Sequence, residues 1–148
     1  VDFGVGFDPQ QLLMKESLGF LEDLKSAFIE AASSFNQLKA STVGRIKIYG
    51  ISNTQADFML FRNGFKLIFS LKEPGVLGIR FHYVGAGFHA PVPGVSEAGT
   101  KVAHEPEDIL MARWGAFGDL VWTYQEQAVK TDYLVKYYVS RFIRESAK

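Results

Sequence analysis

The sequence predicts one α+β domain over residues 1–148, in which a mostly antiparallel sheet of about six strands packs against a long N-terminal helix and a second helix ends the chain. Three patterns predict this class. Apolar residues recur every three or four positions from Asp8 to about Leu38, which is the period of a helix. From Val43 the period changes to two, which is that of a strand. Only a few turn residues separate consecutive strands, and such short links join antiparallel neighbours.

The N-terminal helix has a clear start signal. Asp8 can cap the helix, Pro9 suits its first position, and Gln11 can close a capping box. Gly19 lies inside the helix and is a candidate bend, because glycine costs about 1 kcal/mol relative to alanine there. The predicted buried stripe consists of Met14, Leu21, Leu24, Phe28, Ala31, Phe35 and Leu38.

Strands are predicted near 44–50, 56–62, 65–72, 76–84, 109–114 and 119–125. Asn63-Gly64 between two apolar runs is the strongest hairpin signal, because both residues tolerate positive φ. Glu73-Pro74-Gly75 marks the next turn. The final helix is expected to begin at a cap at Thr131 or Asp132 and to end near Ser146.

Strand alternation divides the predicted sheet into two faces. The core face carries Ile46, Ile48, Phe58, Leu60, Phe65, Leu67, Phe69, Leu71, Leu77, Ile79, Phe81 and Tyr83. The other face carries Arg45, Lys47, Lys66, Lys72, Arg80 and His82 among Tyr49, Met59, Phe61 and Ile68, with Asp57 as almost its only acid. We interpret it first as a solvated face whose lysines discourage aggregation. The alternative is a surface for an anionic partner, with Arg45, Lys47, Lys66 and Arg80 as contacts.

The final helix shows a similar division. Leu134, Val135, Tyr138, Val139, Phe142 and Ile143 form its predicted buried stripe. Tyr133, Tyr137 and Arg144 lie on the opposite side, together with Ser140 and Arg141. Exposed tyrosine with arginine is typical of interface hot spots, so Tyr133, Tyr137 and Arg144 are predicted partner-binding residues. The alternative is that Tyr133 and Tyr137 lie over neighbouring loops.

No organised catalytic or cofactor set is visible in the sequence. Gly85-Ala86-Gly87 follows a strand, but Pro91 and Pro93 prevent the helix that a dinucleotide fingerprint requires. His82, His89 and His104, with Glu105, Glu107 and Asp108, match no known metal-ligand spacing. We therefore expect no metal, no cofactor and no catalytic residue. Asp57 interrupts an apolar run and is either an acid of shifted pKa or a strand-end residue bonded to backbone.

Composition narrows the class of protein further. The 16 acidic and 16 basic residues balance, which argues against nucleic acid as the partner, and no apolar run approaches the length of a membrane span. The absence of cysteine excludes disulfides and leaves the compartment open, with the cytoplasm the interpretation we favour. The 13 phenylalanines require a thick core, a pocket or a partner.

Two functional hypotheses follow. The first is a non-enzymatic interaction module that forms a homodimer through the long helix. A rod of about 30 residues spans about 45 Å, strands of six to eight residues span about 20–27 Å, and Leu18 and Ile29 stand off the main stripe. The second is a small-molecule-binding domain or enzyme, with a pocket under the aperiodic 85–108 segment, which we expect to be a mobile loop. The sequence favours the first, and a pocket would favour the second.

Overall fold

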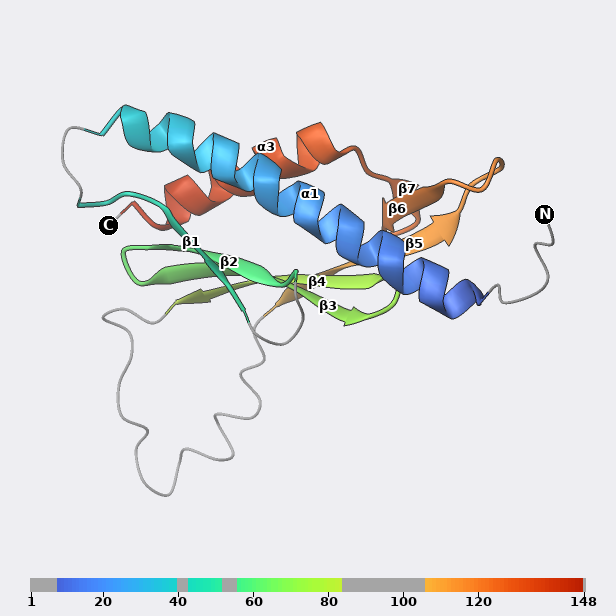
Figure 1. Cartoon of the computed structure of the whole chain (residues 1–148). Helices are drawn as coiled ribbons and strands as arrows, with labels where there is room; N and C mark the ends of the chain where they lie inside the picture. The colour runs from blue at the N-terminus through green and yellow to red at the C-terminus, as the bar shows by residue number, and fades with distance from the viewer. Residues whose placement is uncertain (1–7, 40–42, 52–55, 84–105, 148) are drawn as a thin grey trace, which may run out of the picture.

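The computed structural model describes residues 8–39, 43–51, 56–83 and 106–147 and confirms the α+β class. In these residues an antiparallel sheet runs in strict chain order from β1 to β7, with both helices on one of its faces (Figure 1). The elements are α1 (Pro9–Gln37), β1 (Lys47–Gly50), β2 (Phe58–Arg62), β3 (Phe65–Glu73), β4 (Val76–Tyr83), β5 (Glu107–Trp114), β6 (Leu120–Tyr124), β7 (Gln127–Ala128) and α3 (Thr131–Glu145).

The core lies between the sheet and the two helices. At its centre Phe58 and Phe69 stack with ring centroids 4.7 Å apart, and Phe28 of α1 packs 4.8 Å from Phe69. All three side chains are fully buried, which stabilises the fold by about 1.5–3 kcal/mol for each ring. From α3, Leu134, Tyr138 and Phe142 complete the core. The strand register confirms the predicted core face, since Ile48, Leu60, Leu67 and Phe81 lie in one cross-strand row.

Helix α1 begins and ends as the sequence predicts. The Asp8 side chain accepts a hydrogen bond from the Gln10 amide at 3.0 Å, and the helix continues through Gly19 without interruption. Both ends of α1 are bonded to the sheet. Near the start, the Gly75 amide donates to the Ser17 hydroxyl at 2.9 Å. Near the end, Asn36 exchanges two hydrogen bonds with the backbone of Ile46, which precedes β1.

The structure contains the predicted turns at Asn63-Gly64 and Glu73-Pro74-Gly75, and it also contains one hairpin turn that the sequence did not predict. Asn63 and Gly64 have φ of 52° and 84°, as expected for the β2–β3 turn. After β6, Gln125 and Glu126 adopt φ of 49° and 70° and start a further hairpin. The prediction of about six strands was therefore one short. Gln125-Glu126 contains neither glycine nor asparagine, the residues that usually adopt positive φ in such turns, so its residue types do not predict the turn.

Two predicted boundaries also change. Strand β5 begins at Glu107, so Asp108 belongs to the sheet rather than to the preceding aperiodic segment. Helix α3 begins at Thr131 with Lys130 at the N-cap position, and no side chain caps it. The expected cap at Thr131 or Asp132 was thus placed one or two residues too late.

One buried cation holds three elements together. Arg62 is 7% exposed at the end of β2. Its guanidinium donates to the Gly44 carbonyl at 2.7 Å and to the Ile143 carbonyl at 3.1 Å, and lies 4.9 Å from the ring centroid of Phe35 in α1. Burial lowers the Arg62 pKa from its usual value. The carbonyls near the end of α3 carry the negative end of the helix dipole and so stabilise this charge.

Replacing this arginine should destabilise the whole domain. Arg62→Met keeps a long apolar stem but leaves the part-buried carbonyl of Gly44 and the buried hydroxyl of Ser146 without the donor that Arg62 supplies. We expect the free energy of unfolding to fall by about 2–4 kcal/mol, measured by urea denaturation. Arg144→Met replaces an exposed arginine in the last turn of α3; it is the matched control and should change stability by less than about 0.5 kcal/mol. Equal stability of the two variants would contradict this role for Arg62.

Candidate functional site

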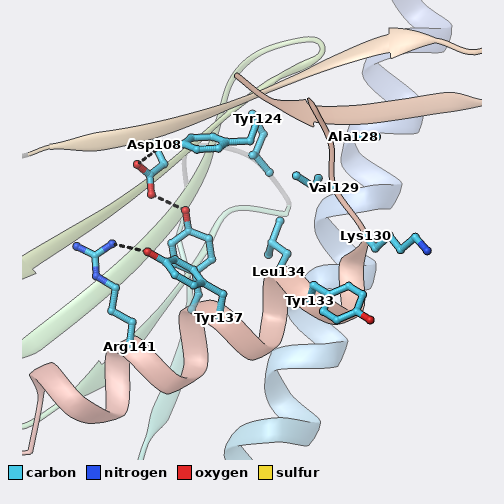
Figure 2. A pocket seen from close by; sticks show the side chains of 11 residues that line it. Asp108, Tyr124, Ala128, Val129, Lys130, Tyr133, Leu134, Tyr137 and Arg141 are labelled. Atoms are coloured by element: carbon cyan, nitrogen blue, oxygen red, sulfur yellow. Dashed lines mark hydrogen bonds between the residues drawn. The ribbon is translucent and has the colours of Figure 1, made fainter. Parts of the chain in front are cut away.

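A groove of about 740 Å³ lies between the sheet and α3 (Figure 2). It is lined by residues of the last three strands, of the link to α3 and of α3 itself: Asp108, Leu110, Tyr124 and Ala128 from β5, β6 and β7, Val129 and Lys130 from the link, and Tyr133, Leu134, Tyr137, Tyr138 and Arg141 from α3. Most of this lining is aliphatic or aromatic. Its charged groups are Asp108, Arg141 and Lys130, and the Lys130 side chain points away from the tyrosines (Figure 2).

Strand alternation places Asp108 on the core face of the sheet. Asp108 lies opposite Ile79 of β4, and Leu110, two residues later, lies opposite Leu77 and is 2% exposed. A carboxylate therefore occupies a position that an apolar side chain would normally fill. The β4 and β6 neighbours and α3 hold it at the inner end of the groove.

Two tyrosine hydroxyls donate hydrogen bonds to this carboxylate. Tyr138, buried on α3, donates to Oδ2 at 2.5 Å, and Tyr124, on β6, reaches Oδ1 at 3.4 Å (Figure 2). Among the described residues no lysine, arginine or histidine forms an ion pair with Asp108. Asp108 is thus a half-buried carboxylate solvated by phenols and not neutralised by a protein cation.

The same contacts keep the two phenols protonated. Burial, together with the bond to Asp108, raises the pKa of Tyr138 far above its usual value of 10.0. The charge of Asp108 is the main cause that raises the pKa of Tyr124, which is much more open to solvent. Both hydroxyls are consequently hydrogen-bond donors at neutral pH, and neither is suited to act as a base.

The arginine of the groove is already engaged. Arg141 donates to the Glu145 carboxylate at 3.0 Å, one helical turn away, and to the Tyr137 hydroxyl at 3.4 Å. Its guanidinium also lies 4.5 Å from the ring centroid of Phe81. The hydrogen bond to Glu145 raises the Arg141 pKa, so the arginine stays charged and its charge is offset locally.

The structure divides the predicted partner-binding residues among four places. Tyr133 and Tyr137 are 69% and 54% exposed and both line the groove, whereas Arg144 is exposed but lies outside its lining. Lys47, Lys66 and Arg80 lie on the sheet face opposite the helices, as predicted. Arg45 does not join them, because it lines a different groove, between α1 and β1.

The basic sheet face is less basic than the sequence suggested. Glu107 reaches it from β5 and forms an ion pair with Lys72 at 3.0 Å. The pair crosses over Gly78, where an added Cβ would overlap the Glu107 carboxylate. Asp57 does not contribute an acid to the open face, because it is 1% exposed and accepts a hydrogen bond from the Leu71 amide at 3.0 Å. Of its two interpretations, the strand-end residue bonded to backbone is confirmed.

Several sequence features fall outside the described residues. These are His89, His104, Glu105, the Gly85-Ala86-Gly87 motif and nearly all of the 85–108 segment. Within the described residues, no three histidine or acidic side chains come together in a way that could hold a metal ion. No described helix has the length and apolar character needed to cross a bilayer.

Comparison with known proteins adds no relative to this geometry. The chain matches no protein-family model, and no curated protein or solved structure is significantly similar to it. The function must therefore be inferred from the chemistry of the described residues.

Sequence reasoning missed the residues at the centre of the groove. Asp108 was assigned to the aperiodic segment, Tyr138 to the buried stripe, and Tyr124 to the end of a strand without a role. One signal was available. Asp108 has the same parity as Leu110 and Ala112, so extending the strand by two residues would have placed an acid on the core face.

Removing the Tyr138 hydroxyl tests this description through the pH dependence of stability. Because the folded-state pKa of Tyr138 lies above its unfolded value of 10.0, its contribution is present below pH 10 and is lost as the pH rises further. The Tyr138→Phe variant lacks the hydrogen bond to Asp108. Its free energy of unfolding at neutral pH should therefore be about 1–3 kcal/mol lower than that of the parent protein. It should also show a shallower loss of stability above about pH 10 than the parent protein.

The measurement is thermal or urea unfolding between pH 6 and about pH 11. Tyr133→Phe, at an exposed position on the same helix, is the matched control and should follow the parent curve. A Tyr138→Phe curve parallel to the parent curve up to the highest pH would show that Tyr138 ionises as an ordinary tyrosine.

Proposed function

We propose that this protein binds a small organic cation in the groove between its sheet and α3. The observation that carries this proposal is the Asp108 carboxylate, which lies in a tyrosine-lined groove with phenol donors and no cationic partner among the described residues. A small-molecule-binding domain is the alternative that the sequence left open, but its pocket was expected under the 85–108 segment. The groove between the sheet and α3 supports the same class of function at a different place.

The size and lining of the groove support a small ligand. A volume of about 740 Å³ falls within the range of about 300–1,000 Å³ that is typical of ligand sites. Leu110, Leu134 and Val129 supply an apolar wall, while the tyrosine hydroxyls and Asp108 supply a few converging polar groups. An apolar ligand body with one polar group matches this distribution.

The charges support a cation rather than an anion. Arg141 is committed to Glu145, and Lys130 points away from the tyrosines, so the negative charge of Asp108 remains to be matched. A primary ammonium could donate directly to this carboxylate, and such a charge-assisted bond is stronger than a neutral one. The rings of Tyr124 and Tyr137 can add cation–π attraction, because an aromatic face attracts a positive charge.

The groove supports binding and not chemistry. Its two phenols in contact with Asp108 have raised pKa values and stay protonated. Among the described residues, its lining includes no serine, threonine, cysteine or histidine that could act as a nucleophile or base. We propose a binding protein, in agreement with the sequence-based preference for a non-enzyme.

Self-association through α1 is a second proposal, supported by Ile29, which is 47% exposed, and by Leu38, which is 84% exposed. The structure reduces the apolar surface on which the prediction depended. Met14, Leu18 and Phe35 pack partly against the core, because α1 crosses the sheet and is bonded to it near both ends. What remains exposed is a smaller patch near the second half of the helix.

The ligand proposal can be tested with phenethylammonium as the probe in an NMR titration of amide shifts. We expect saturable binding that shifts residues around 108, 124 and 138. Asp108→Asn should weaken it at least about tenfold, since a charge-assisted hydrogen bond contributes about 1.5–3 kcal/mol. Asp23→Asn, an exposed acid on α1, is the matched control and should bind as the parent does. Equal binding of 3-phenylpropionate, its anionic counterpart, or undiminished binding by Asp108→Asn would contradict a cation site.

The self-association proposal predicts a particle near twice 16.5 kDa in sedimentation equilibrium. Ile29→Glu should shift it toward the monomer, because a charge cannot be buried at an apolar contact. Glu30→Gln, the exposed neighbour, should leave the mass unchanged. A monomer at high protein concentration would rule out this second function while leaving the ligand proposal unaffected.

A further inference from the structure

We propose that the outer edge of β1, together with the groove beside α1, accepts an extended acidic segment of another protein as an additional strand. This site is separate from the Asp108 groove. Asp108 is on β5, and β2, β3 and β4 lie between β5 and β1 in the sheet (Figure 1).

The backbone of β1 presents hydrogen-bonding groups outward at every second residue. The Ile51 amide donates to the Asp57 carbonyl at 2.8 Å, so Ile51, and by alternation Tyr49 and Lys47, direct their backbone groups toward β2. Ile48 and Gly50 must then direct theirs away from the sheet. In the described part of the chain no strand lies on that side of β1.

Asn36 shows what this edge can accept. Its side-chain amide donates to the Ile46 carbonyl at 3.0 Å, and its carbonyl accepts from the Ile46 amide at 2.8 Å. These are the two bonds that a neighbouring strand would make, supplied here by one asparagine. The edge is thus closed at Ile46 and, within the described residues, open at the next two outward positions, Ile48 and Gly50.

A groove of about 500 Å³ runs beside this open edge, between α1 and β1. Its helix side consists of Lys25, Ile29, Ala32 and Asn36, which follow one face of α1, and its strand side includes Ile46 and Ile48. Ile29 is 47% exposed there. In an added strand, the side chains next to Ile48 would point into this groove, so the alternate positions of the partner should be apolar.

The charges around the edge select an acidic partner. Lys25 and Arg45 line the groove, no carboxylate does within the part of the chain that the structure describes, and exposed Lys47 lies on the strand itself. An added Cβ on Gly50 would lie 3.8 Å from the Lys25 ammonium, so this cation sits directly over the open backbone. Lysines at an edge also discourage pairing between identical chains. A second copy would bring the same cations to the contact, whereas a segment with acidic residues would neutralise them.

The experiment uses a blocked peptide of about eight residues in which valine alternates with glutamate, titrated into the full chain by calorimetry. We expect binding that weakens at least about tenfold with Lys47→Glu and falls with added salt. Lys66→Glu is the matched control, because Lys66 lies in the same cross-strand row but inside the sheet, and it should retain affinity within about twofold. A peptide that alternates valine with lysine should not bind.

Backbone methylation of the peptide provides the decisive control without altering the protein. N-methyl groups on every second amide remove the donors that strand addition needs, and we expect binding to disappear for one methylation pattern and to persist for the other. No binding of the valine–glutamate peptide at millimolar concentration would overturn the proposal. So would binding that is indifferent to both methylation patterns, or a dimer of this chain that Gly50→Pro dissociates.

Discussion

The structure depends on covering one apolar sheet face that is wider than a single helix. Phe58 and Phe69 stack near the middle of that face, and Phe28 of α1 closes over them. Helix α1 crosses the sheet from the β3–β4 turn, where Ser17 bonds to Gly75, to the approach to β1, where Asn36 bonds to Ile46. On this path α1 reaches only part of the β5–β6 side, where Phe20 stacks on Trp122 of β6 at 4.6 Å. Leu134, Tyr138 and Phe142 of α3 cover more of the same face. Because sheet and helices are discrete layers, grooves remain where their side chains do not meet.

Two charged side chains inside this fold, Arg62 and Asp108, are stabilised in opposite ways. Arg62 is surrounded by backbone carbonyls, among them one near the negative end of α3, and by the ring of Phe35, so its partners all belong to the fold. Asp108 is held by two phenols and faces an open groove. The first arrangement is complete by itself, which is typical of a structural charge. The second leaves the charge of Asp108 without a cationic partner among the described residues, which is the feature on which the proposed ligand site depends.

The edges and the open face of the sheet carry charged or closed positions for the same physical reason. An antiparallel meander in chain order has two edges and one open face, and each must be paired, charged or covered. At one edge β7 is only two residues long. At the other, Asn36 closes one position of β1 and lysines surround the next. The open face carries Lys47, Lys66 and Arg80, with the Lys72–Glu107 pair among them.

The sequence by itself determined the helices, most strands, the turn at Asn63-Gly64 and the division of the sheet into two faces. These properties follow from local periodicity and φ preference, which a residue and its near neighbours set. It did not determine β7, because Gln125 and Glu126 adopt positive φ without the residues that favour it. Tertiary structure alone decided that Asp108, Tyr124 and Tyr138 meet, since they come from β5, β6 and α3. Their distance depends on how α3 packs after the β6–β7 turn, and no local pattern encodes that packing.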